Sequence, residues 1–192
     1  MTPNITLPGF ADPVAQAQAT FRAVLDAMSA PGSLHAAGVG LSAPAPLCPA
    51  IAALLLTMID GEAPLAIDAA SAAAQDWIGF HCGAVFTVPA HASFALAMAC
   101  PDLATLHAGS DEGPEEACTL LLQVQALGTG THYRLTGPGL QTPATLGVAG
   151  LPDDFAARWA ANHGLYPRGV DIILCAGTTL AALPRSVAVE PV

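Results

Sequence analysis

The sequence predicts an α/β domain of three layers with a mixed central sheet. Segments with helical and strand patterns alternate along the chain, and a glycine-rich turn separates one pair of strands. With 53% hydrophobic and 10% charged residues, the chain can bury a substantial core. A length of 192 residues suits one core, so we expect a single domain over residues 1–192.

The clearest helix follows Asp12. This residue is a good N-cap, Pro13 suits the first helical position, and apolar residues recur with helical spacing as far as Met28. Ala30-Pro31-Gly32 ends the helix, because proline disfavours helix in the residue before it and glycine permits a left-handed turn. Further helices are predicted at 49–59, 71–77, 91–99 and 151–162.

Strands are predicted between these helices. The apolar run 170–175 is typical of a strand buried on both faces, and 118–127 is long enough to cross a sheet. Gly128-Thr129-Gly130 indicates a tight turn, so 131–136 is expected to pair antiparallel with the strand before it. Shorter strands are predicted at 33–37, 65–68, 84–88 and 187–189.

The charged residues exclude several functions. Fifteen acidic and five basic side chains give a formal net charge of −10, which repels the phosphates of nucleic acids. All five cations are arginines, because the sequence has no lysine. A Schiff base to pyridoxal phosphate, a Walker A loop and a lysine general base are therefore excluded. We expect neither a cofactor nor a nucleic-acid partner.

The sequence also indicates the compartment. The five cysteines form no CxxC pair and stand in apolar contexts, so they are expected to be reduced and buried. The six histidines lack the spacing of metal ligands, so no metal site is predicted. Residues 1–10 do not resemble a secretory signal, and the apolar run 50–59 is roughly half as long as a bilayer span. We therefore expect a cytoplasmic protein without membrane contact.

Two local motifs resemble functional signatures. Gly38-Val39-Gly40 begins a loose dinucleotide-binding pattern, but Pro44 and Pro46 stand where the phosphate-facing helix should run. A connector is therefore expected there. His81 and Cys82 place an imidazole beside a thiol, yet neighbours on extended backbone point to opposite faces. A structural hydrogen bond is the expected role of His81.

The densest polar signal is Tyr166-Pro167-Arg168-Gly169-Val170-Asp171. Arg168 and Asp171 flank the start of an apolar strand, where they either face a ligand or form a structural ion pair. Arg185 also follows a proline, which makes a shared anion or a partner's carboxylate a further alternative. The acidic stretch 110–116 is expected to be a solvated turn, with metal binding or docking of a partner's arginine as alternatives. No catalytic residue is assigned, and the candidates for ligand or partner binding are His81, Glu115, Arg168, Asp171 and Arg185.

Several of these motifs occur together in one order. Ala27-Met28-Ser29-Ala30-Pro31-Gly32 is followed by Phe80-His81, Gly137-Pro138-Gly139, Pro167-Arg168-Gly169-Val170-Asp171 and Leu183-Pro184-Arg185. In this combination the sequence resembles the PhnH family, a subunit of the carbon-phosphorus lyase complex. The resemblance spans nearly the whole chain.

The resemblance implies a fold similar to the large domain of type I pyridoxal-phosphate transferases, without the cofactor. It also implies a homodimer that joins other subunits in a larger core complex. The implied reaction is the first committed step of phosphonate breakdown, in which methylphosphonate displaces adenine from ATP to give ribose 1-methylphosphonate 5-triphosphate. The family offers no settled catalytic residues for this subunit.

The scarcity of cations bears on the role within such a complex. A triphosphate usually requires several cations, Mg²⁺ or a glycine-rich nest, and this chain has only five arginines. We therefore expect structural or regulatory support of a neighbouring active site, with ATP or phosphonate bound only within the complex. Two alternatives stay open: a self-sufficient hydrolase or transferase that uses His81 and a cysteine, and a non-catalytic module that binds a small molecule.

Overall fold

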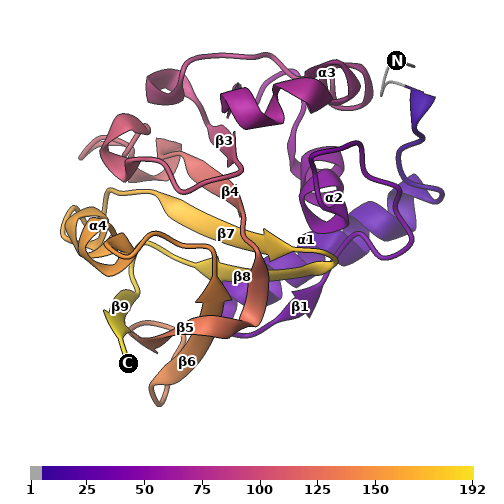
Figure 1. The fold of residues 1–192 in the computed structure, drawn as a ribbon. Coiled ribbons are helices and arrows are strands. Elements are labelled where there is room, and N and C mark those ends of the chain that lie inside the picture. The colour runs from indigo at the N-terminus through magenta and orange to yellow at the C-terminus, as the bar shows by residue number, and fades with distance from the viewer. Residues whose placement is uncertain (1–5) are drawn as a thin grey trace.

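The computed structural model describes residues 6–192, which form four α-helices and nine strands joined by short 3-10 turns (Figure 1). The helices are α1 (Pro13–Ser29), α2 (Pro49–Met58), α3 (Gln75–Cys82) and α4 (Phe155–His163). The 3-10 turns are η2 (Ala69–Ala74), η3 (Pro89–His91), η4 (Leu103–Thr105) and η5 (Pro114–Glu116). The strands are β1 (His35–Ala36), β2 (Leu65–Ile67), β3 (Phe94–Ala97), β4 (Thr119–Gln123), β5 (Ala126–Thr136), β6 (Ala144–Ala149), β7 (Asp171–Ala176), β8 (Thr179–Leu183) and β9 (Ala188–Pro191).

The strands form two sheets. The larger has six strands in the order β1-β8-β7-β4-β3-β2, and the smaller has three in the order β6-β5-β9. Strands β2, β3, β4 and β7 are parallel, whereas β8 is antiparallel to its neighbours β7 and β1. The predicted α/β class and the mixed sheet are confirmed, but the sequence did not indicate the second sheet.

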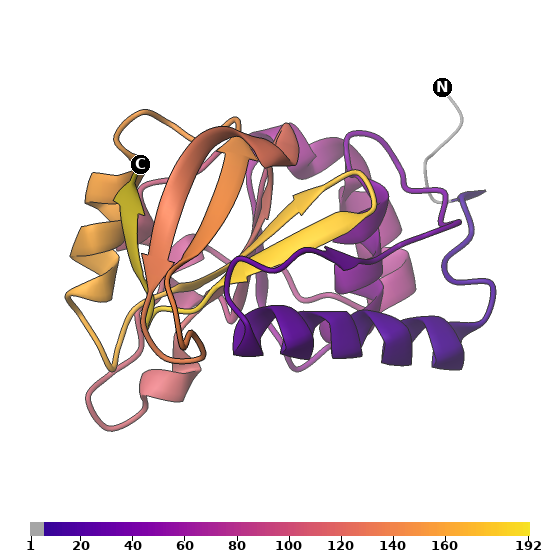
Figure 2. The same ribbon diagram turned by 90° about the horizontal axis from the view of Figure 1, so that it is seen from below.

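The large sheet separates two hydrophobic cores. Alternate residues of a strand point to opposite faces, and in β4 this places Leu121 in one core and Leu120 and Leu122 in the other. The core around Leu121 contains buried residues of α1, α2 and α3, while the opposite core contains those of α4 and the small sheet. Figure 2 shows α4 and the small sheet at left and α1 with α2 at right. One outer layer is therefore helical, and the other combines a helix with a sheet.

The predicted start of α1 is confirmed in detail. Asp12 Oδ1 accepts a hydrogen bond from the backbone N–H of Ala15 at 3.1 Å, and Gln16 Oε1 accepts one from the backbone N–H of Asp12 at 2.9 Å. Both contacts satisfy N–H groups that have no partner within a helix. Gly32 adopts the left-handed conformation expected after the helix, with φ of +89°.

Two predictions between residues 84 and 99 are wrong. The segment expected as a helix at 91–99 contains strand β3, because its backbone pairs in parallel with β2 on one side and β4 on the other. This pairing outweighs the helix propensity of its alanines and leucine. The segment expected as a strand at 84–88 forms only an isolated bridge from Phe86 to Leu65, and Pro89 then provides no N–H for a longer ladder.

The predicted hairpin at Gly128-Thr129-Gly130 is also wrong. These residues lie inside β5, where Leu127 and Thr131 both pair with Val148 of β6 across a bulge. A Cβ atom on Gly130 would lie 2.7 Å from the carbonyl oxygen of Val148, so the bulge brings two backbones into close contact. The connection between β5 and its antiparallel partner β6 comes later, after Gly137.

Two predicted helices are displaced. The one expected at 71–77 is the 3-10 turn η2 followed by α3, which continues to Cys82 and stops at Gly83 with φ of +64°. The one expected at 151–162 begins only at Phe155, after a turn in which the Phe155 N–H donates to the carbonyl of Pro152. Within residues 6–192, no helix combines the length and apolar composition of a membrane crossing.

Candidate functional site

Three of the five candidate residues, Glu115, Asp171 and Arg185, line one hollow of about 310 Å³. Its other lining residues are Pro114, Tyr166, Pro167, Pro184 and Ser186. We call this cavity the Arg185 hollow.

Strand pairing explains why these residues meet. Asp171 is the first residue of β7, and Arg185 follows the end of β8. Because β7 and β8 are antiparallel, with Ile172 opposite Leu183, the start of one strand lies beside the end of the other. On its other side, Asp171 pairs with Thr119, the first residue of β4. Glu115 lies in η5, the turn that precedes β4 in the sequence. The hollow therefore lies at the amino end of the parallel strands.

Asp171 and Arg185 form a bidentate ion pair at the base of the hollow. Arg185 Nη2 lies 2.6 Å from Asp171 Oδ2, and Nε lies 3.2 and 3.1 Å from Oδ1 and Oδ2. The backbone N–H of Arg185 donates to Asp171 Oδ1 at 2.7 Å, and Nη1 donates to the carbonyl of Pro114 at 2.6 Å. The side chain of Arg185 is only 16% exposed and that of Asp171 only 12%. Each guanidinium nitrogen has an acceptor, so Arg185 is held as a structural group.

Arg168 does not enter this ion pair. Its Nε lies 3.0 Å from Oδ1 of Asp111, whose side chain is exposed. The structural partner of Asp171 is thus Arg185, although Arg168 is much closer in sequence. Since Arg168 and Arg185 are each paired with a carboxylate of their own, the hypothesis that they share one anion has no support in this geometry.

His81 lies elsewhere, half-buried on α3. Its Nε2 is 3.0 Å from the carbonyl oxygen of Leu7, which also accepts a hydrogen bond from Trp77 Nε1 at 2.9 Å. The His81 and Trp77 rings are 4.7 Å apart between centroids. His81 therefore holds the segment before α1 against α3, as the structural interpretation of the sequence predicted.

Cys82 does not have the chemistry of a nucleophile. It follows His81 on a helix and not on the extended backbone that the sequence suggested. Burial raises the pKa of the Cys82 thiol to about 12, so the thiol is protonated at neutral pH. Burial likewise raises the pKa of Cys100 to about 11 and that of Cys118 to about 12. The five cysteines are free, but only Cys118 and Cys175 are fully buried, so the prediction of burial is wrong for the other three.

A second cavity was not foreseen from the sequence. It has a volume of about 520 Å³ and lies where β3, β4 and β7 end, between Met98, Gln123 and Gly177. Cys48, the N-cap residue of α2, also lines it, and its backbone N–H donates to Gln123 Oε1 at 2.7 Å. Ligands of parallel sheets usually bind at this carboxyl end. The signal available in the sequence was Gln123, a polar residue at the end of the apolar strand β4.

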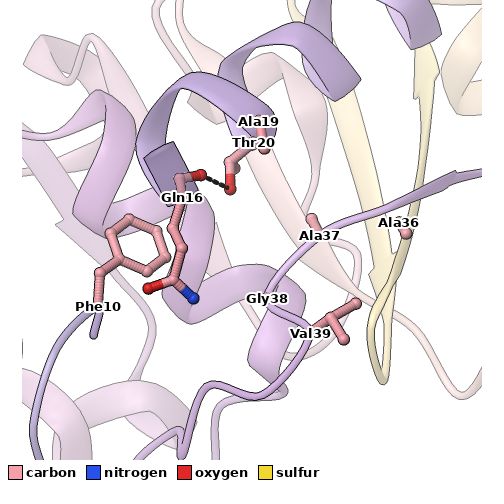
Figure 3. Close-up of a pocket in the computed structure, with 8 residues that line it drawn as sticks. All are labelled: Phe10, Gln16, Ala19, Thr20, Ala36, Ala37, Gly38 and Val39. Atoms are coloured by element: carbon pink, nitrogen blue, oxygen red, sulfur yellow. Dashed lines mark hydrogen bonds between the residues drawn. The ribbon is translucent and has the colours of Figure 1, made fainter. Parts of the chain in front are cut away.

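A third cavity, of about 260 Å³, lies between α1 and the segment 36–39 (Figure 3). The amide of Gln16 lies between Phe10 and this segment in Figure 3 and is already used by the α1 cap. Gly38 packs against the start of α2, since a Cβ atom here would lie 2.1 Å from the carbonyl oxygen of Pro49. The glycine-rich motif therefore serves close packing of the backbone. Among residues 6–192, no three potential metal ligands lie close enough together to hold an ion.

Comparison with known proteins relates nearly the whole chain to one protein family. A family model described as "Bacterial phosphonate metabolism protein (PhnH)" matches residues 8–190. A protein of Rhizobium meliloti (strain 1021), named alpha-D-ribose 1-methylphosphonate 5-triphosphate synthase subunit PhnH, is 36% identical over 187 residues, which cover 94% of either chain. The putative C-P lyase subunit protein HtxG of Stutzerimonas stutzeri is 32% identical over 172 residues, 88% of this chain and 83% of that protein.

Proposed function

Because this chain belongs to the PhnH family of bacterial phosphonate metabolism proteins, we propose that it is a subunit of a carbon-phosphorus lyase complex. In this role it supports the formation of ribose 1-methylphosphonate 5-triphosphate from ATP and methylphosphonate, a transferase reaction. It acts as a structural or regulatory component and does not catalyse the reaction alone. The relative from Rhizobium meliloti supports this role, because its name makes it a subunit of that synthase.

The ion pairs of the chain support a non-catalytic role. Four of the five arginines are each within 4 Å of a carboxylate: Arg134 with Glu190, Arg158 with Asp154, Arg168 with Asp111, and Arg185 with Asp171. The remaining one, Arg22, is exposed on α1 and has no ion pair within residues 6–192. The protein thus has little free positive charge for a triphosphate. This observation is the main support for the proposal that the active site lies on, or is shared with, another subunit.

The remaining properties implied by the family resemblance are proposed with it. The mixed sheet is compatible with a fold similar to the large domain of type I pyridoxal-phosphate transferases. Pairing of β1 with β8 joins distant parts of the chain in one sheet, which supports a single domain over 1–192. The homodimer is proposed from the resemblance alone, and the cytoplasmic location from the cysteines, which form no disulfide.

Two measurements on the purified protein test this function. Co-expressed with the other carbon-phosphorus lyase subunits, the chain should elute with them in a stoichiometric complex. In isolation, titration calorimetry should detect no tight binding of ATP or methylphosphonate. Full turnover by the isolated chain, or failure to co-elute with any subunit, would contradict the proposal.

We expect Arg168→Lys to lower the affinity of this chain for the complex by roughly tenfold. A loss of this size corresponds in free energy to about one hydrogen bond to a charged group. Lysine keeps the charge but loses the planar fork that arginine presents to a carboxylate. Because the pair with Asp111 is exposed, the free energy of unfolding should change by less than about 1 kcal/mol. Arg134→Lys, at the exposed pair with Glu190, is the matched control. Unchanged assembly and unchanged growth on methylphosphonate with Arg168→Lys would refute this prediction.

A further inference from the structure

The Arg185 hollow retains an exposed carboxylate and an exposed aromatic ring beside its ion pair. Arg185 and Asp171 satisfy each other, so they add no net charge to the cavity. Glu115 is exposed and makes no ion pair with any residue in 6–192. Tyr166 is 62% exposed, which is unusual for a large aromatic side chain. The open part of the hollow is thus negative and has an aromatic wall.

An apolar groove of about 530 Å³ lies next to the hollow, between α4 and η4. Its apolar lining consists of Leu103, Ala104, Ala108, Ala157, Ala161 and Leu165. The groove and the hollow share no lining residue, but two segments pass from one to the other: Ala108 comes shortly before η5, and Leu165 directly before Tyr166. A hydrogen bond from the Gly169 N–H to the carbonyl of Ala108, 2.9 Å long, joins these segments.

Charge indicates what this surface binds. The chain has a net charge of −10, and the unpaired charge in the hollow is that of Glu115. A partner that presents a cationic side chain would be attracted to this carboxylate. The aromatic wall favours a guanidinium, which can stack on Tyr166 while it forms a bidentate pair with Glu115.

We propose that the Arg185 hollow and the apolar groove form one docking surface for another subunit of the complex. The partner places an arginine between Glu115 and Tyr166 and an apolar side chain in the groove beside α4. This inference rests on the proposed role as a subunit. Buried arginine and tyrosine contacts often dominate the affinity of such interfaces.

Two pairs of variants test this surface in the co-expressed complex. Glu115→Arg reverses the charge in the hollow, and Glu62→Arg makes the same change in the exposed turn after α2. Ala161→Gln fills the groove, and Ala160→Gln adds the same side chain at an exposed neighbour that does not line it. All four positions are exposed, so the variants should keep the melting temperature of the parent.

We expect Glu115→Arg and Ala161→Gln each to weaken association by about tenfold or more, whereas the two controls bind like the parent. If both test variants assemble like their controls, the docking surface is refuted while the subunit role stands. If only one of them weakens association, the combined surface is refuted as well. If the unaltered chain joins no complex, the subunit role itself fails, and the docking surface fails with it.

Discussion

Replacement of Trp159 by alanine is expected to unfold the protein or bring it close to unfolding. Trp159 is fully buried in the core between the large sheet and α4, where its ring stacks on Phe155 with 6.3 Å between centroids. Its Nε1 donates a hydrogen bond of 2.7 Å to the carbonyl of Val187. Truncation of a buried tryptophan costs about 3 to 5 kcal/mol, and an unsatisfied carbonyl about 1 to 3 kcal/mol more. Domains of this size have a total stability of only about 5 to 15 kcal/mol.

Urea denaturation followed by circular dichroism measures this loss. Trp159→Phe keeps an aromatic ring but not the hydrogen bond to Val187, so it should have an intermediate effect. Phe80→Ala is the control for an exposed aromatic, because Phe80 is 66% exposed, and it should change the stability far less. A Trp159→Ala protein that melts within about two degrees of the parent would show that this core does not depend on Trp159.

The second large effect is expected at the ion pair of Asp171 and Arg185. Removal of either partner leaves the other charge nearly buried and unpaired, which typically costs about 3 to 5 kcal/mol. Removal of Arg185 also leaves the carbonyl of Pro114 without the donor that holds η5 in place. Asp171→Ala and Arg185→Ala should each lower the free energy of unfolding by roughly this amount. The double variant should lose much less than the sum of the two, because no unpaired charge then remains.

The surface pair of Arg134 and Glu190 provides the matched cycle. Its atoms are 3.7 Å apart and its side chains are 54% and 62% exposed. Exposed pairs contribute about 0 to 1 kcal/mol, so the Arg134→Ala and Glu190→Ala variants should be nearly as stable as the parent. If variants of the Arg134–Glu190 pair lost as much free energy of unfolding as variants of the Asp171–Arg185 pair, the buried pair would have no special structural role.

Local patterns predicted the elements that depend mainly on local interactions. The cap at Asp12 and the stop at Gly32 were correct because capping involves residues within one turn of each other. The apolar run that became β7 was correct because a strand buried on both faces needs apolar residues throughout. The structural role of His81 was also anticipated, although its partner Leu7 could not be.

Elements that depend on distant partners were missed or assigned wrongly. Strand β3 has a helix-like composition and is a strand only because it lies between β2 and β4. The glycines at 128 and 130 suggested a hairpin, but they form a bulge inside β5, whose partner β6 begins only at Ala144. The partner of Asp171 was missed for the same reason, because only the pairing of β7 with β8 brings Arg185 next to it.

Composition and the order of motifs were enough to set the chemical limits of this protein and to indicate its family. The missing lysines, the net charge of −10 and the ordered motifs are properties of composition and order, which do not depend on how the chain folds. In contrast, the pairing of charged groups and the position of the cavities depend on contacts between distant segments of the folded chain. The Arg185 hollow is built by segments around residues 115, 166 and 185, and no local pattern encodes their contact. That contact arises from strand pairing across the large sheet, which also brings Arg185 to its partner Asp171.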